Sequence, residues 1–281
     1  MLIRIRHITE YAFASPVFFE PHVLRFRPKE TPDISVREFH FTLKPEPSGQ
    51  SQQMDVEGNH TILCWFENTH DQMRIEADSV VEVKEFNPFN FLINPSEYLT
   101  VPFEYGKKTR QLLNQSLATE APSEAIKVFV MGVAKQSDHG TVSFLASLTR
   151  EIHKDFVLMT RETGRPHSPE YTFAQKKGSC RDLAWMEIHM LRQMGIAARF
   201  VSGYYFLNMD NPEYELHAWV EAYLPGAGWI GLDPGHGILT NCFHIPAASS
   251  AFYEFTMPVT GTIRGSARST MRNELAIRLD P

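Results

Sequence analysis

Cys180 is the residue of this sequence best placed to act as a nucleophile. It lies in the segment GSCRDL (178–183), directly before residues whose apolar side chains recur at helical spacing. A thiol in the first turn of a helix lies beside backbone N–H groups without helical acceptors and beside the positive end of the helix dipole, and both favour the thiolate. The sequence therefore predicts a reactive cysteine at the start of a helix.

Two residues farther along the chain could complete a triad with Cys180. His217 begins the strand-like segment HAWVEAY (217–223), and Asp233 ends the segment WIGLD (229–233). A hairpin that pairs Tyr223 with Trp229 would put Asp233 on the same face as His217, as a diagonal neighbour roughly 7–8 Å away. A register slip of one residue would put the two on opposite faces. We therefore predict that Cys180, His217 and Asp233 form a catalytic triad whose geometry depends on this hairpin.

These three residue types in this order indicate attack on the carbonyl of a carboxamide. His217 would hold the thiolate as an ion pair, and Asp233 would fix the tautomer of the imidazole and stabilise its cationic form. The oxyanion needs two donors, for which the backbone N–H of Cys180 and the side chain of Gln175 are candidates. Trp219 could line the acyl-binding cleft, and buried packing within the hairpin is an equally good explanation of it. Departure of the amine leaves a thioester, which water would hydrolyse and an amine would convert to a new amide.

Other cysteine and histidine residues suggest alternatives that fit less well. A lone cysteine before a helix is usually a small buried apolar residue, and only the histidine and aspartate motifs favour a catalytic role for Cys180. We interpret Cys64, within the apolar segment ILCWF (62–66), as a core residue and Cys242 as a structural residue. His236 and His244 suggest a metal site near the triad, but no pair of ligands has the spacing of a zinc finger, so a metal-dependent hydrolase is the weaker hypothesis. We expect no metal and no cofactor.

Composition describes an ordinary globular protein and excludes some partners. The chain has 281 residues, of which 43% are hydrophobic and 21% charged, with a net charge of −6. This charge gives no basic field to attract nucleic acid, and no apolar stretch is long enough to cross a membrane. The three cysteines are widely separated, which favours a reducing compartment, so we expect a cytoplasmic protein. From the triad we expect its substrate to be a peptide or protein amide. The sequence does not specify an oligomeric state.

The pattern of apolar residues predicts an α+β protein in two parts. Short alternating segments separated by turns predict an antiparallel β-sandwich in the N-terminal part; they are 2–7, 23–27, 35–43, 61–66 and 74–83. Helical periodicity follows over 125–135 and again from Thr141, which we expect to cap the second helix. The nucleophile helix should end at Gly195 and lead into strands over 197–206, 216–223 and 229–233. We divide the chain into a β domain (1–90), a helical connection (91–140) and a catalytic core (141–281).

Four motifs in order resemble the bacterial branch of the transglutaminase-like superfamily, often described as predicted cysteine proteases. They are GSCRDLA (178–184), GIAARFVSGY (195–204), HAWVE (217–221) and LDP (232–234), and segments such as HITEY (7–11) resemble the β domain that precedes the core in that branch. The resemblance implies a papain-like α+β core with Cys180 as nucleophile, His217 as base and Asp233 as orienter. Members of this superfamily include cross-linking enzymes, peptidases, amidases and catalytically silent scaffolds. We expect a protease or amidase ahead of a cross-linking enzyme, and the alternative is a non-catalytic binding or scaffold protein with the same fold.

Two segments depart from the pattern of this branch. Gly235-His236 follows Asp233-Pro234 where Thr-Asn is usual, and SAFY (250–253) stands where a Gly-Arg-Asp-Tyr segment is common. Neither departure removes a predicted member of the triad. We expect them to alter the substrate pocket and the packing of the C-terminal region.

Overall fold

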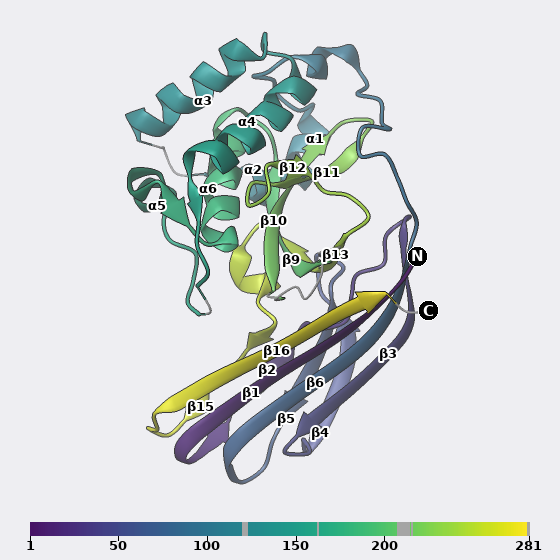
Figure 1. Cartoon of the computed structure of the whole chain (residues 1–281), viewed down its shortest axis with the longest axis vertical. Coiled ribbons are helices and arrows are strands. Elements are labelled where there is room, and N and C mark those ends of the chain that lie inside the picture. Colours follow the sequence, from purple (N-terminus) through teal and green to yellow (C-terminus); the bar gives the residue numbers. More distant parts are fainter. Residues whose placement is uncertain (120–122, 162, 207–213, 215, 280–281) are drawn as a thin grey trace.

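The computed structural model describes residues 1–119, 123–161, 163–206, 214 and 216–279, which form two layered halves (Figure 1). In chain order the elements are β1 (Leu2–Phe19), β2 (His22–Leu24), β3 (Ile34–Lys44), β4 (Gly49–Met54), β5 (His60–Trp65), β6 (Thr69–Val83), the 3-10 helix η1 (Ser96–Leu99), α1 (Lys107–Leu112), α2 (Asn114–Leu117), α3 (Glu124–Gln136), α4 (Thr141–Asp155), β7 (Val157–Leu158), α5 (Pro169–Gln175), β8 (Lys177–Gly178), α6 (Cys180–Gln193), β9 (Ala198–Tyr205), β10 (His217–Leu224), β11 (Gly228–Asp233), β12 (Ile238–Leu239), β13 (His244–Ser250), the 3-10 helix η2 (Tyr253–Thr256), β14 (Val259–Thr260), β15 (Ile263–Arg264) and β16 (Ser269–Leu279).

The N-terminal half is a sandwich of two antiparallel sheets. One sheet has the order β15-β1-β6-β3, with β16 also paired to β1, and the other has the order β14-β2-β5-β4. Of the apolar side chains between them, Phe19, Leu24, Cys64 and Ile75 are at most 1% exposed. Alternation of buried and exposed residues along β1 and β6 is what directs one face of each strand into this core.

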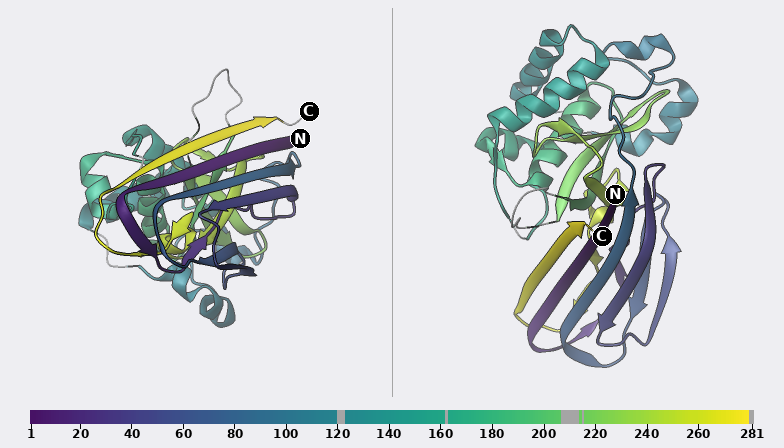
Figure 2. Two further views of the ribbon diagram at one scale, coloured as in Figure 1. Left: turned by 90° about the horizontal axis from the view of Figure 1, so that it is seen from below. Right: turned by 45° about the vertical axis from the view of Figure 1, so that its right-hand side comes forward.

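The long strands of the sandwich extend beyond it and pack against the other half. Ile3 and Ile5 at the start of β1 join Val81 of β6 and Ile245 of β13 in a separate apolar cluster. Because β1 has 18 residues, it reaches roughly 60 Å, far enough to serve both cores. Figure 2 shows the ends of these strands beneath the helical half of the molecule. The two halves are therefore joined by a shared apolar interface.

The second half is a five-stranded antiparallel sheet covered by helices. Its order is β12-β11-β10-β9-β13, and α6 packs across β9 and β10 (Figure 1). Leu183, Met186 and Met190 recur at helical spacing on the buried face of α6 and are not exposed to solvent. Among the described residues, no helix is both long and apolar enough to span a membrane.

The predicted α+β class, with a sandwich followed by a cysteine-bearing helix on an antiparallel sheet, is confirmed. The polar strand Gly49–Met54 was not predicted, because its edge position buries none of its six side chains and leaves no apolar alternation. Gly140, not Thr141, is the N-cap of α4; the Thr141 hydroxyl instead donates to the carbonyl of Tyr98 at 2.6 Å.

The last strand differs from the predicted division of the chain. Residues 141–281 were assigned to the catalytic core, but Ser269–Leu279 pairs with β1 over eleven residues in the sandwich. Strand pairing between the two ends of a chain leaves no local signal, because the partners are more than 250 residues apart. The C-terminal strand thus belongs structurally with the N-terminal sheet.

Candidate active site

The first turn of α6 presents Cys180 and is held by Asp182. The backbone N–H and the hydroxyl of Ser179, the N-cap residue, both donate to Asp182 Oδ2 at 2.7 Å. Cys180 is half-buried, and as the first residue of the helix it keeps a backbone N–H without an intrahelical acceptor. The helix ends before Gly195, whose φ of 77° requires a residue that tolerates left-handed backbone. The residues around Cys180 therefore form the predicted helix, with the thiol in its first turn.

Asp182 also fixes the loop that precedes the helix. Its other oxygen, Oδ1, accepts from Arg161 at 2.6 Å and from the backbone N–H of His167 at 2.7 Å. Burial alone would raise the pKa of Asp182, but the hydrogen bonds from His167 and Ser179 and the charge of Arg161 lower it. The Asp182 carboxylate, two residues after the thiol, is therefore ionised, and hydrogen bonds and the charge of Arg161 compensate its negative charge.

Asp182→Ala is expected to lower the free energy of unfolding by about 3 kcal/mol, because it leaves the buried donors of Ser179 without an acceptor and the charge of Arg161 without its carboxylate partner. Urea unfolding would measure the change. Glu170→Ala is the matched control, since Glu170 is an exposed acid in the first turn of α5 and should cost less than about 0.5 kcal/mol. Equal losses in the two variants would contradict this role of Asp182.

The hairpin of β10 and β11 brings His217 and Asp233 together in the predicted register. Tyr223 lies opposite Trp229 and Val220 opposite Leu232, which leaves His217 and Asp233 on one face. His217 Nε2 lies 2.7 Å from Asp233 Oδ2, and the Asp233 side chain is not exposed. Cys180 lies close enough to His217 to raise its pKa, and the Cys180 sulfur lies 4.0 Å from the carbonyl oxygen of Leu216, the residue before His217. Because Asp233 occupies Nε2, the Nδ1 atom of His217 is the ring nitrogen available to the sulfur.

Charge at this hairpin favours a protonated His217. Burial would lower the pKa of His217, but the charge and the hydrogen bond of Asp233, with a smaller contribution from Cys180, raise it to about 10. Burial would likewise raise the pKa of Asp233, and the charge of His217 with hydrogen bonds from His217, His236 and His244 lowers it well below its usual range. The site therefore holds an imidazolium between a carboxylate and a thiol.

Two further histidines contact Asp233. His236 Nδ1 and His244 Nε2 lie 2.8 and 3.0 Å from Oδ2, the same oxygen that His217 contacts. Asp233, His217 and His236 place possible metal-ligating atoms within 4.8 Å of one another. In that group, a ring nitrogen of His217 and one of His236 are already hydrogen-bonded to Asp233. The arrangement is therefore explained as a hydrogen-bonded cluster.

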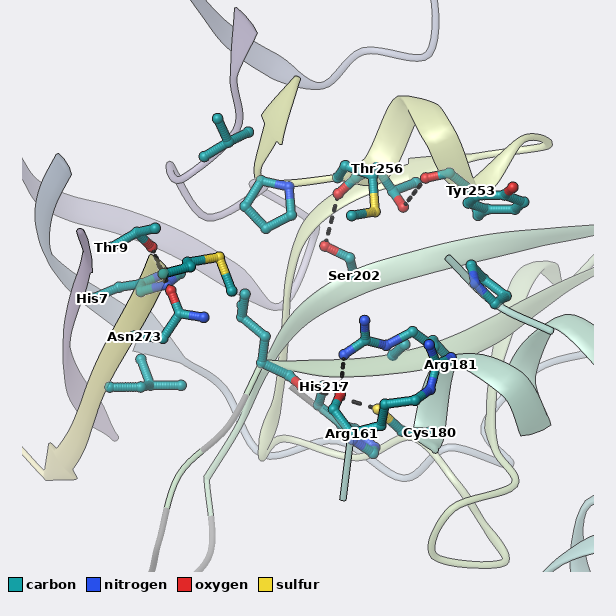
Figure 3. Close-up of a pocket in the computed structure, with 18 of the residues that line it drawn as sticks. His7, Thr9, Arg161, Cys180, Arg181, Ser202, His217, Tyr253, Thr256 and Asn273 are labelled. Carbon is teal, nitrogen blue, oxygen red and sulfur yellow. Dashed lines mark hydrogen bonds between the residues drawn. The ribbon is translucent and has the colours of Figure 1, made fainter. Parts of the chain in front are cut away.

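Cys180 and His217 line a cavity of about 430 Å³ between the two halves of the molecule (Figure 3). One wall comes from the core, including Arg161 and Ser202. The opposite wall is one face of the N-terminal sheet, where Thr9 of β1 lies opposite Asn273 of β16 and donates to its Oδ1 at 2.9 Å. A substrate that reaches the thiol would therefore contact both halves.

The two predicted substrate-binding residues do not line this cavity. Gln175 is exposed at the end of α5, and Trp219 is only 2% exposed, with its ring packed against the rings of His217 and His244. Substrate binding by either residue stays a prediction. Arg161 and the wall of β1 and β16 were not predicted as parts of the site, because the motif HITEY (7–11) on β1 indicates a β domain and not a position opposite Cys180.

The geometry defines an α+β protein with a cysteine at a helix N-terminus facing a histidine and an aspartate on an antiparallel hairpin. Two family models match the chain: the bacterial transglutaminase-like N-terminal region over residues 3–82 and the transglutaminase-like superfamily over residues 132–234. The chain belongs to the transglutaminase-like superfamily.

Two of the similar proteins cover most of the chain, and a third covers part of it. An uncharacterized protein of Mycobacterium tuberculosis is 25% identical over 291 residues, covering 95% of this chain and 89% of the relative. A protein-glutamine gamma-glutamyltransferase of Pseudomonas aeruginosa is 32% identical over 103 residues, which cover 33% of this chain and 15% of that protein. The crystal structure of a candidate cysteine protease from Cytophaga hutchinsonii has a TM-score of 0.72 at 20% identity and covers 99% of this chain and 90% of that chain. This last similarity shows that the fold extends over both halves.

Proposed function

We propose that the protein is a thiol enzyme that cleaves or transfers the acyl group of an amide or peptide bond through a Cys180–His217–Asp233 triad. The observation that carries this proposal is the position of His217, which is hydrogen-bonded to Asp233 and lines one accessible cavity together with Cys180. A histidine with a strongly shifted pKa beside a cavity-lining cysteine is typical of a catalytic site.

The proposed reaction has two balanced halves. The Cys180 thiolate forms a C–S bond to the amide carbonyl carbon, and the oxyanion that develops is stabilised by the backbone N–H of Cys180. His217 gives its proton to the departing nitrogen as the C–N bond breaks, which leaves a thioester and a neutral imidazole. Water or an amine then attacks the thioester and loses a proton to His217, so that thiolate and imidazolium are restored.

Hydrolysis is the preferred outcome within this proposal. The fold similarity to the candidate cysteine protease covers 99% of this chain, whereas the similarity to the gamma-glutamyltransferase covers 33% of it. We therefore propose a protease or amidase ahead of a cross-linking enzyme, with a peptide or protein amide as substrate.

Selective alkylation tests this function within a single molecule, because the two other cysteines serve as internal controls. Iodoacetamide at pH 7 is expected to modify Cys180 first, as measured by mass spectrometry of peptides over time. Burial raises the pKa of the Cys64 thiol to about 11 and also raises that of Cys242, so both should react slowly. Cys180→Ala should in addition abolish any amidase activity found. Preferential labelling of Cys64 or Cys242, or full activity in Cys180→Ala, would contradict the proposal.

A further inference from the structure

Asp233 has more hydrogen-bond partners than a carboxylate that only orients His217 would need. Its Oδ2 atom lies 2.7, 2.8 and 3.0 Å from ring nitrogens of His217, His236 and His244. Its Oδ1 atom accepts from the backbone N–H groups of Gly235 at 2.9 Å and His236 at 3.3 Å. An ionised carboxylate offers about four lone-pair directions, so the acceptor capacity of Asp233 is filled.

Proton positions follow from the chemistry of the carboxylate. Ionised Asp233 can only accept, so each of the three ring nitrogens that contact it must carry a proton. Burial lowers the pKa of His244, which makes this ring neutral with its proton on Nε2. Its Nδ1 atom lies 3.1 Å from both the backbone N and Oδ1 of Asn241, and in the neutral ring it accepts the backbone N–H. His244 is thereby fixed as a neutral donor to Asp233.

The rings are also held in place by packing against an aromatic ring. Tyr205 of β9 packs against all three imidazoles, with centroid distances of 5.5 Å to His217, 4.5 Å to His236 and 4.4 Å to His244. The His244 side chain is 2% exposed and that of His236 is 32% exposed. The cluster is therefore closed on the side of His244 and partly open on the side of His236.

The turn after β11 is shaped to bring His236 onto the carboxylate. Gly235 follows Pro234, and a Cβ added to Gly235 would lie 3.1 Å from Asp233 Oδ1 and 3.4 Å from a carbon of the His217 ring. A glycine therefore lets the chain wrap closely around Asp233, and His236 can donate from both its backbone and its ring.

We propose that His236 and His244 are positioning residues that act through Asp233. Their N–H groups stop the carboxylate from rotating and keep it an acceptor only, so that His217 retains its proton and its orientation toward Cys180. The inference rests on the proposed function, because it assigns these residues a role in the same thiol chemistry.

A double-mutant cycle with iodoacetamide as the probe tests this role. His244→Phe keeps the ring volume but removes the donor, and it should slow alkylation of Cys180 about tenfold, the value of a hydrogen bond to a charged group. In an Asp233→Asn background the same change should alter the rate by less than about twofold, because the acceptor charge is already gone. His244→Gln, whose amide nitrogen can replace Nε2, should restore most of the rate. A purely structural role would slow both backgrounds equally.

His236 gives a second arm that does not depend on a buried substitution. His236→Ala should slow alkylation of Cys180, whereas His236→Asn, whose amide nitrogen can replace Nδ1, should not. Thermal unfolding of each variant identifies any that fail to fold. If a His244 variant fails to fold, the comparison of His236→Ala with His236→Asn decides whether the inference holds, because His236 is partly exposed.

The two arms separate failure of this inference from failure of the proposed function. Normal alkylation in both His236→Ala and His244→Phe, together with slow alkylation in His217→Ala, would overturn the inference alone. Normal alkylation in His217→Ala and in Asp233→Asn would overturn the proposed function and the inference with it.

Discussion

Asp233→Asn is expected to lower the free energy of unfolding by about 3 kcal/mol at pH 7, because it leaves a buried imidazolium and two further N–H donors without a charged acceptor. The loss should depend on pH. The folded pKa of Asp233 lies well below the unfolded value of 3.8, so its contribution is present above pH 3.8 and is lost as the pH falls through the folded pKa. Urea unfolding of wild type and variant between pH 3 and pH 7 would measure both effects.

Asp78→Asn provides the control for Asp233→Asn. Asp78 pairs with Arg4 at 2.9 Å, but both side chains are more than a quarter exposed, and such pairs contribute less than about 1 kcal/mol. Similar losses in Asp78→Asn and Asp233→Asn would contradict the buried-pair account of Asp233.

His217→Ala is expected to slow alkylation of Cys180 by iodoacetamide about 30-fold at pH 7, because an unassisted cysteine is only a few per cent thiolate at that pH. Turnover of an amide substrate should fall further, by about 10²–10⁴-fold, because the proton donor to the leaving nitrogen is also lost. His139→Ala is a control, since His139 lies in the turn before α4 and does not line the cavity.

The stabilisation that protonated His217 provides should also depend on pH. Its folded pKa of about 10 lies above the usual value of 6.5, so the stabilisation it provides is complete below pH 6.5 and is lost as the pH rises through 10. ¹⁵N NMR of the ring should therefore report an imidazolium at pH 8. A neutral ring at pH 8 would contradict the ion pair.

Local patterns predicted the central part of the site. The spacing of apolar residues after Cys180 fixed the helix, and the loop length between Tyr223 and Trp229 fixed the register that brings Asp233 beside His217. Both features depend on neighbours within about twenty residues, which is the range over which periodicity and turn chemistry are informative.

Side-chain hydrogen bonds and long-range strand pairing were beyond such patterns. The carboxylate of Asp182 is compensated by Arg161, and the cavity wall opposite Cys180 depends on pairing of Thr9 with Asn273. His236 and His244 were noticed as possible metal ligands because of their residue type, but only the folded turn shows that both contact Asp233. Long-range strand pairing and side-chain hydrogen bonds leave no periodic signal in a single sequence.

Trapping of an acyl group on Cys180 is the most direct test of the central claim. The protein would be incubated briefly with a panel of peptide amides, quenched in acid and digested, and the peptide that contains Cys180 would be weighed by mass spectrometry. We predict a mass increase equal to the acyl group of one donor, removed by hydroxylamine and absent in His217→Ala. An acyl group found only on other residues, or the same yield on Cys180 in His217→Ala, would contradict the account.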